Sequence, residues 1–187
     1  MVNLGRQAEV SERSATNWHV ITGAPCSGKT TVIHELERRG YSVVHEVARA
    51  YIEAKLAEGF SLSQIRGNEL AFEQRLLEEK VAIEKKLRAG NTIFFDRSVP
   101  DSIAYFRLSG FDPSEPIAQS RRRRYKHIFL LDRLPARKDT VRKEDDRTAS
   151  IIETLLIECY SDLGYPLIRI PVSSVSDRID AILKHLG

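Results

Sequence analysis

The sequence predicts an α/β domain in which a parallel sheet carries helices on both faces. Two observations carry this prediction: short, apolar, β-branched segments alternate with longer amphipathic segments, and glycines or charged residues separate them. Parallel strands need crossover connections, and the helices in those connections cover both faces of the sheet. With 187 residues, of which 42% are hydrophobic, the chain is long enough for one such domain with a sizeable core.

Five segments have the length and composition of buried strands, and capping residues and amphipathic patterns predict helices between them. The expected strands cover residues 18–22, 41–45, 92–96, 127–131 and 167–170. The expected helices cover residues 31–39, 46–58, 98–108 with Ser98 as cap, 148–163, and 177–186 with Ser176 as cap, together with one long helix from Ser61 to Gly90 and a basic helix before residue 127. Residues 1–16 are polar, and we expect a flexible extension there, followed by a single domain at 17–187.

The turn between the first strand and the first helix fits the phosphate-binding pattern G-x-x-x-x-G-K-[ST]. Its glycines allow the backbone amides to turn inward around phosphate groups, and the following helix adds the positive end of its dipole. Lys29 is expected to reach the β- and γ-phosphates, and the Thr30 hydroxyl to ligate Mg²⁺. The residues expected to bind a nucleoside triphosphate are Gly23, Ala24, Pro25, Cys26, Ser27, Gly28, Lys29, Thr30 and Thr31.

Two acids follow apolar strands that are expected to end beside this turn. Asp96 can hold Mg²⁺ directly or through water, and the adjacent Arg97 can stabilise the negative charge of a transferring phosphoryl group. Asp132 competes for the metal role, and Asp96 has the alternative role of a loop acid or helix cap. Neither acid is followed by a glutamate, which argues against a motor-type ATPase.

Glu46 lies just past the second strand, at the same predicted edge of the sheet. A carboxylate there can accept a proton from a substrate hydroxyl as it attacks the γ-phosphorus. Arg49 lies one helical turn later and can hold the acceptor or a phosphate, so Glu46, Arg49 and Asp96 form the expected acceptor site. The alternative is a solvated acid at a helix start, paired with Arg49. A kinase also needs a second pocket, expected between these residues and the loop 110–116.

The charged segment at about 133–147 has the composition of a lid that closes over a triphosphate and supplies arginines. Arg142 and Arg147 are the expected catalytic arginines, with Arg137 as a further candidate. A solvated charged loop is the alternative. Such a lid would exclude water from the transferring phosphoryl group.

Composition argues against several other functions. The four consecutive arginines at 121–124 lack interleaved aromatic residues, so we interpret them as a solvated surface helix and expect no nucleic-acid partner. His34, His45 and His127 lack metal-ligand partners at a useful spacing and are interpreted as structural. The two cysteines make neither a disulfide framework nor a metal site, which favours a reducing, cytoplasmic setting. No apolar run is long enough to span a membrane, and residues 1–16 do not resemble a secretory signal.

Four runs of residues together resemble one protein family. They are Gly23 to Thr30, His45-Glu46-Val47-Ala48-Arg49, Phe95-Asp96-Arg97-Ser98 and Arg142-Lys143-Glu144-Asp145. The family is the group of small P-loop proteins labelled "AAA domain", which is similar to the nicotinamide-riboside kinase part of NadR. More distantly, Glu46 and the Asp96-Arg97-Ser98 run resemble the paired motifs of deoxynucleoside kinases, although this chain lacks the proline that often follows that glutamate. The resemblance implies a P-loop NTPase fold of the kinase type, with strand order 2-3-1-4-5.

These observations predict a Mg²⁺- and ATP-dependent kinase of a small, nucleoside- or riboside-like metabolite. Lys29, Thr30 and Asp96 would hold MgATP, Glu46 would serve as base, and Arg97 with the lid arginines would stabilise the transition state. The alternative is a nucleotide-binding switch that controls a protein partner, or a plain NTP hydrolase. No N-K-x-D guanine motif is present, which favours ATP and leaves GTP open.

Overall fold

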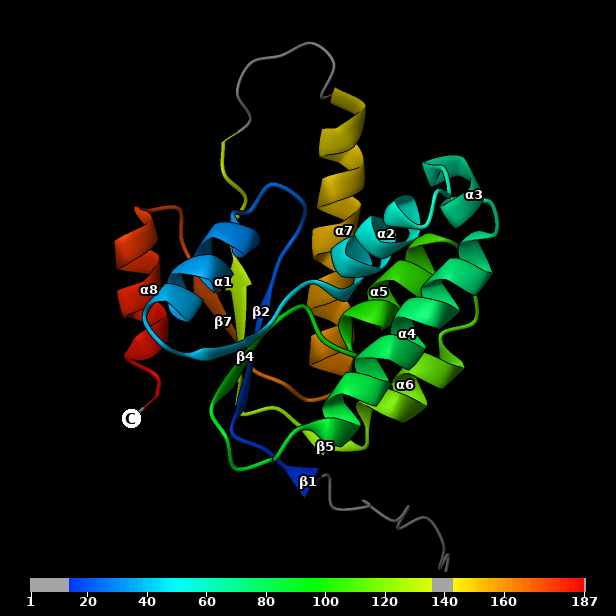
Figure 1. Ribbon diagram of the computed structural model, residues 1–187. Coiled ribbons are helices and arrows are strands. Elements are labelled where there is room, and N and C mark those ends of the chain that lie inside the picture. The colour runs from blue at the N-terminus through cyan, green and yellow to red at the C-terminus, as the bar shows by residue number, and fades with distance from the viewer. Residues whose placement is uncertain (1–13, 136–142, 187) are drawn as a thin grey trace, which may run out of the picture.

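The computed structural model describes residues 14–135 and 143–186, and a five-stranded parallel sheet forms its centre (Figure 1). The strands are β2 (Trp18–Thr22), β3 (Ser42–Val44), β4 (Ile93–Asp96), β6 (His127–Leu131) and β7 (Leu167–Ile170). They lie side by side in the order β3-β4-β2-β6-β7, which is 2-3-1-4-5 when the five are counted along the chain. The predicted α/β fold is confirmed. Two short strands, β1 (Ser14–Ala15) and β5 (Arg123–Arg124), form a separate parallel pair that was not expected.

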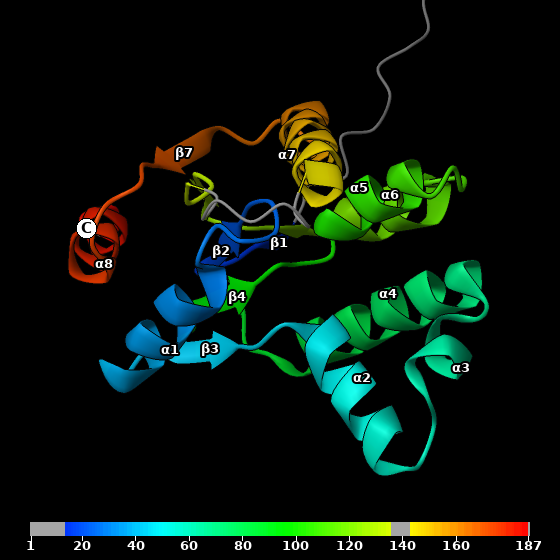
Figure 2. The same cartoon turned by 90° about the horizontal axis from the view of Figure 1, so that it is seen from above.

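Helices cover both faces of the sheet, as Figure 2 shows from above. The helices are α1 (Lys29–Arg38), α2 (Val47–Ala57), α3 (Leu62–Arg66), α4 (Glu69–Lys86), α5 (Asp101–Leu108), α6 (Ser114–Ser120), α7 (Lys143–Asp162) and α8 (Val175–Leu183). One face carries α1 and α8, while α4, α5 and α7 lie on the other side, where α2 packs against α4. Among the described helices, none combines the length and the apolar content that a membrane crossing requires.

The strands are buried on both faces because successive side chains point to opposite sides of the sheet. One core lies between the sheet and the helices α5 and α7, and the other lies between the sheet and the helices α1 and α8. The first includes Trp18, Val20, Phe95, Ile128, Leu156 and Tyr160; the second includes Ile21, Leu36, Phe94, Phe129 and Ile179. This two-sided burial explains why the strands read as near-continuous apolar runs.

The prediction of one long helix from Ser61 to Gly90 is wrong, because the chain forms two helices there, α3 and α4. Ser61 caps α3 as expected, accepting a hydrogen bond from the amide of Gln64 within a capping box. Asn68 then caps α4 by accepting a hydrogen bond from the amide of Ala71. An asparagine side chain that bonds the backbone in this way starts a new helix instead of continuing the old one. The apolar stripe did not reveal this break because most of the stripe belongs to α4.

The arginine run at 121–124 is not on a helix, so that prediction is also wrong. Arg123 and Arg124 pair their backbone with β1 instead. The Arg124 guanidinium lies 4.3 Å from the ring centroid of Tyr165 and donates hydrogen bonds to the carbonyls of Leu163 and Gly164. Stacking on an aromatic ring and bonding to a helix end give this cation a local structural role.

Three predicted helix starts also differ from the structure. Helix α5 begins at Asp101 without a cap from Ser98, whose hydroxyl bonds the side chains of Asp101 and Tyr160 instead of a helix amide. Helix α7 begins at Lys143 and not at residue 148, and α8 is capped by Ser174 in place of Ser176. Helix ends depend on local hydrogen bonds that several nearby polar residues could provide, so the sequence places them only approximately.

His19 lies in the second core with its imidazole stacked on Phe94, at a ring-centroid distance of 5.0 Å. Neither ring nitrogen has a hydrogen-bond partner among the described residues. Burial lowers the pKa of His19 from 6.5 to about 4, and the neighbouring His127 adds to the shift. The folded protein therefore holds His19 in its neutral form.

This burial predicts an acid-sensitive contribution to stability. The unfolded chain protonates His19 below its ordinary pKa of 6.5, whereas the folded chain resists protonation down to about 4, so stability falls as the pH falls between these values. Replacing His19 with leucine should remove about 2–3 kcal/mol of the stability loss between about pH 7 and about pH 4.5. Urea unfolding at both pH values measures this, with His185→Leu as the exposed-histidine control. Equal acid sensitivity of His19→Leu and the parent protein would contradict the prediction.

Candidate functional site

The phosphate loop, residues 23–28, connects the end of β2 to the start of α1. Gly23 has a φ of 143°, and a Cβ built on it would lie 2.7 Å from the carbonyl oxygen of Leu131. Gly28 has a φ of 83°, in the left-handed region that glycine adopts without strain. Both glycines are therefore required by the local geometry, as the motif predicts. Cys26, with a φ of 62°, shares this left-handed conformation although it carries a side chain.

Lys29 turns its ammonium back into the phosphate loop. Its Nζ donates hydrogen bonds to the carbonyls of Gly23 and Ala24, both at 2.9 Å, and to the hydroxyl of Ser27 at 3.2 Å. Burial lowers the pKa of Lys29 to about 7, and the nearby Arg97 guanidinium adds to the shift. A phosphate bound here would supply the negative charge that this buried ammonium lacks.

Asp96 ends β4 beside β2, opposite Ile21 in the strand register. The carboxylate is buried, and one of its oxygens, Oδ1, has no hydrogen-bond partner among the described residues. Burial and the nearby Glu46 carboxylate raise the pKa of Asp96 to about 6. Asp96 and Thr30 line the same cavity, and a carboxylate oxygen together with a hydroxyl oxygen is a set of hard donors that suits Mg²⁺. The residues present therefore fit a magnesium ion.

Asp132, the competing candidate for the metal role, is engaged elsewhere. Its carboxylate accepts a hydrogen bond from Arg169 Nε at 3.0 Å. It lines neither of the two cavities described below, whereas Asp96 lines one of them together with Thr30. The geometry favours Asp96.

Glu46 and Arg97 form an ion pair at the mouth of the site. Arg97 is buried, has a left-handed φ of 65°, and donates from Nε to Glu46 Oε1 at 3.2 Å. Its guanidinium lies 5.3 Å from the Tyr105 ring centroid and 3.5 Å from the Asp101 carboxylate. The alternative in which Glu46 pairs with Arg49 is not seen among the described residues.

Two cavities open beside the phosphate loop, and Thr30, Glu46 and Arg49 line both of them. The first, called the loop cavity, measures about 490 Å³ and is lined by Pro25, Cys26, Gly28, Lys29, Thr30, Glu46, Arg49, Arg66, Arg97, Tyr105 and Ile152. The second, called the α1–α2 cavity, measures about 370 Å³ and is lined by Thr30, His34, His45, Glu46, Arg49, Ala50, Glu53 and Asp96. The loop 110–116 lines neither, so the expectation that it forms a wall of the acceptor pocket is wrong.

Three residues of the loop cavity were not expected from the sequence: Arg66, Tyr105 and Ile152. They come from α3, α5 and α7, and no motif marks any of them. Four cationic side chains therefore line the loop cavity, those of Lys29, Arg49, Arg66 and Arg97. Among the described residues, only one carboxylate lines it, that of Glu46. This charge balance favours an anionic ligand.

The middle of the predicted lid, residues 136–142, lies outside the described residues, and it includes Arg137 and Arg142. Arg147 is exposed on α7 and lines neither cavity. The two ends of the segment are fixed: Arg133 donates to the carboxylate of Asp146, and the amide of Leu134 donates to the carbonyl of Cys26 at 3.3 Å. The start of the segment is thus joined directly to the phosphate loop.

Arg178 of α8 supports the phosphate loop from behind, and nothing in the sequence marked it. Its guanidinium is buried and donates to the carbonyl of Ser27 at 2.6 Å, of Pro171 at 3.1 Å and of Asp132 at 3.3 Å. A buried charge that satisfies three carbonyls fixes all three segments relative to one another. No local motif identifies this role, because the three acceptors are backbone atoms far apart in sequence.

Comparison with known families agrees with this geometry. The family model described as "AAA domain" matches residues 18–178. A search of the curated proteins found no match.

Solved structures share the fold. Thymidylate kinase from Ehrlichia chaffeensis is 14% identical with a TM-score of 0.65, over 93% of this chain and 100% of that chain. NadR in complex with NAD and AMP-PNP is 16% identical with a TM-score of 0.68, over 92% of this chain and 50% of that chain. Deoxyadenosine kinase from M. mycoides is 15% identical with a TM-score of 0.57, over 90% of this chain and 98% of that chain. The resemblance to NadR and deoxynucleoside kinases is confirmed, and at these identities it concerns the fold.

The Arg178 contacts predict a loss of nucleotide affinity on substitution. In Arg178→Gln the Ser27 carbonyl loses its charged donor and the phosphate loop loses its support, so we expect MgATP to bind about tenfold more weakly. Titration with a fluorescent ATP analogue measures this under conditions where circular dichroism shows a folded protein. The control is Arg169→Gln, which removes an exposed arginine of β7. If Arg178→Gln lowered the stability but left the MgATP affinity unchanged, Arg178 would hold α8 in place without supporting nucleotide binding.

Proposed function

The chain belongs to the P-loop family described as "AAA domain", and on this basis we propose that it is a Mg²⁺- and ATP-dependent kinase of a small acceptor. One observation supports this proposal most strongly. Glu46, a candidate base, faces the same loop cavity as Lys29 and Thr30 of the phosphate loop. A binding protein needs only the loop, whereas phosphoryl transfer needs a base and an acceptor volume beside it.

Each residue has a distinct proposed role in this reaction. The backbone amides of residues 23–31, apart from Pro25, which has no N–H, bind the triphosphate together with the Lys29 ammonium, and Thr30 and Asp96 would hold Mg²⁺. When bound, the metal ion neutralises charge on the phosphate oxygens. The hydroxyl oxygen of the acceptor forms a bond to the γ-phosphorus, and the bond from that phosphorus to ADP breaks. Glu46 accepts the proton that the hydroxyl loses. Arg97 holds Glu46 in place and lies near the charge that develops on the transferring group.

The acceptor would lie in the loop cavity, between Glu46 and the side chains of Arg66 and Tyr105. An aromatic ring and arginines suit a ring-bearing, nucleoside- or riboside-like compound. Arg49 stays a candidate for binding that compound, and Arg142 and Arg147 stay predicted contributors to the transition state. The free thiols of Cys26 and Cys159 support the proposed cytoplasmic setting.

The alternative function, a nucleotide-dependent switch, has one observation in its favour. Large apolar side chains are exposed around the connection from α2 to α3: Leu56 at 43%, Phe60 at 45% and Leu62 at 55%. Clustered exposed apolar residues suit a protein partner. An ATP or GTP hydrolase without an acceptor is the third possibility.

One assay separates these functions. ADP release from MgATP is measured alone and with a panel of nucleosides, ribosides and their monophosphates. A kinase shows strong stimulation by one class of compound, and Lys29→Ala, which lacks the phosphate-binding ammonium, abolishes it. A flat response with tight nucleotide binding would reject the kinase in favour of the switch, and steady release without any acceptor would favour the hydrolase.

Substitution of Glu46 tests the base. Glu46→Gln keeps the size of the side chain but cannot take up the proton, so transfer to the acceptor should fall by about 10²–10⁴-fold while ATP affinity stays nearly unchanged. Glu58→Gln, an exposed acid at the end of the same helix, is the matched control. Single-turnover transfer and ATP titration measure the two quantities. Transfer by Glu46→Gln at the parent rate would rule out the base assignment.

A further inference from the structure

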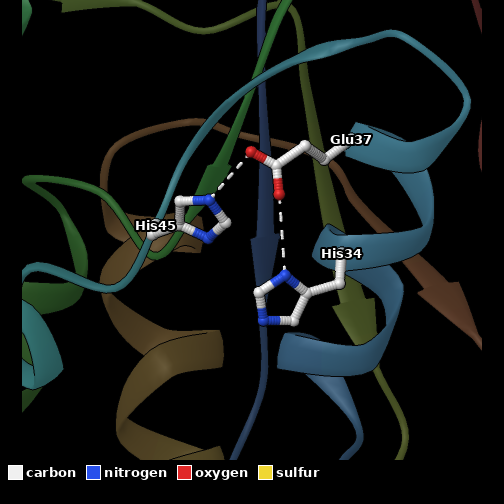
Figure 3. A group of neighbouring side chains, drawn as sticks. All are labelled: His34, Glu37 and His45. Atoms are coloured by element: carbon white, nitrogen blue, oxygen red, sulfur yellow. Dashed lines mark hydrogen bonds and ion pairs between the residues drawn. The ribbon is translucent and has the colours of Figure 1, made fainter.

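The side chains of two histidines and a glutamate point toward one another (Figure 3), and the two histidines line the α1–α2 cavity. His34 and Glu37 lie one turn apart on α1, and His45 follows β3. Glu37 lies between the two imidazoles: its Oε2 is 3.6 Å from His34 Nδ1, and its Oε1 is 3.2 Å from His45 Nε2. The sequence interpretation of His34 and His45 as residues without metal-ligand partners is therefore wrong. Glu37 lies on the same helix as His34, and the fold brings His45 to this pair from the segment after β3.

The spacing of these atoms matches the needs of a transition metal. One ligand atom from each residue lies within 4.8 Å of the other two. A tetrahedral ion with bonds of about 2.0–2.1 Å separates its ligand atoms by roughly 3.3 Å, so small side-chain rotations complete the site. Two imidazoles and one carboxylate form a donor set that binds Zn²⁺ and related ions, whereas Mg²⁺ prefers oxygen donors.

Ordinary ion pairing accounts poorly for this cluster. All three side chains are exposed, so solvent screens the charges of any ion pair between them. One hydrogen bond, from His45, and one longer contact, to His34, leave this solvated carboxylate with little stabilising interaction. A divalent ion, in contrast, binds two neutral imidazoles and a carboxylate at once.

We propose that His34, Glu37 and His45 form a binding site for a transition-metal dication of the Zn²⁺ type. This site is separate from the magnesium position at Thr30 and Asp96, and it does not depend on the kinase reaction. The bound ion would join α1, which carries Lys29, to the segment that leads directly into Glu46. His34 and His45 also line the α1–α2 cavity, so a fourth coordination position can be taken by water or by a ligand there.

Metal binding is measured directly on the full chain, without nucleotide and after removal of metals with a chelator. Isothermal titration with ZnCl₂ should show one ion per chain, and the melting temperature should rise with ZnCl₂ concentration because the ion binds the folded state. His34→Gln, His45→Gln and Glu37→Gln should each weaken binding by at least about tenfold. His185→Gln, which removes an exposed histidine elsewhere, should bind like the parent.

Cobalt substitution identifies the ligands. Co²⁺ should give the visible absorption of a tetrahedral nitrogen and oxygen site, and Cys26→Ser should leave it unchanged. Cys26 is included because it is an exposed thiol that could bind these metals by itself. A thiolate-to-metal band that disappears in Cys26→Ser, unchanged Zn²⁺ affinity in the three glutamine variants, or no Zn²⁺ binding by the parent would each overturn the proposal.

Discussion

The arrangement of the site depends on the pairing of one buried cation, Arg97. A guanidinium cannot lose its charge, so burial forces the chain to bring acids to it. Glu46 and Asp101 fill that role from the starts of α2 and α5. Asp101 in turn accepts hydrogen bonds from the hydroxyls of Thr22 and Tyr160, on β2 and α7. This network joins four elements around the left-handed backbone of Arg97 and fixes where the candidate base lies.

A second constraint acts on the phosphate loop itself. Lys29 occupies the inner side of the loop by bonding its carbonyls, and Arg178 bonds the outward-facing carbonyl of Ser27. Two cations, Lys29 and Arg178, thus hold the loop through its carbonyl groups. Positive charges that are partly buried lower the stability of the folded protein. A bound polyphosphate would raise it again, because its negative charge compensates them. The site is organised for an anion before one arrives.

Local patterns predicted the strands and the phosphate loop because both depend on neighbouring residues: apolar runs for burial, and Gly23 for a backbone that tolerates no Cβ. Contacts between residues far apart in the sequence could not be predicted from such local patterns. Asp96 ends one strand beside β2 and Asp132 follows another, and they are distinguished by features that no local pattern shows: Asp132 pairs with Arg169 on β7, whereas Asp96 is buried and lines the α1–α2 cavity. Tyr105 and Arg178 have no motif, since their roles arise from packing between distant elements. The break in the long helix was not predicted either, although its cause is local: one asparagine that caps a new helix outweighs a continuous apolar stripe.

The two carboxylates at the site lie close enough to influence each other, and their surroundings separate their roles. Glu46 shares a hydrogen bond with Arg97 and is partly exposed to the loop cavity, where a substrate hydroxyl can reach it. Asp96 is buried, and its pKa is raised to about 6, with one oxygen left without a partner. An acid of that kind gains most from a nearby cation, because a metal ion removes both the burial cost and the repulsion from Glu46. These environments support the proposed roles, a metal ligand for Asp96 and a base for Glu46, although both are simple carboxylates at the ends of neighbouring strands.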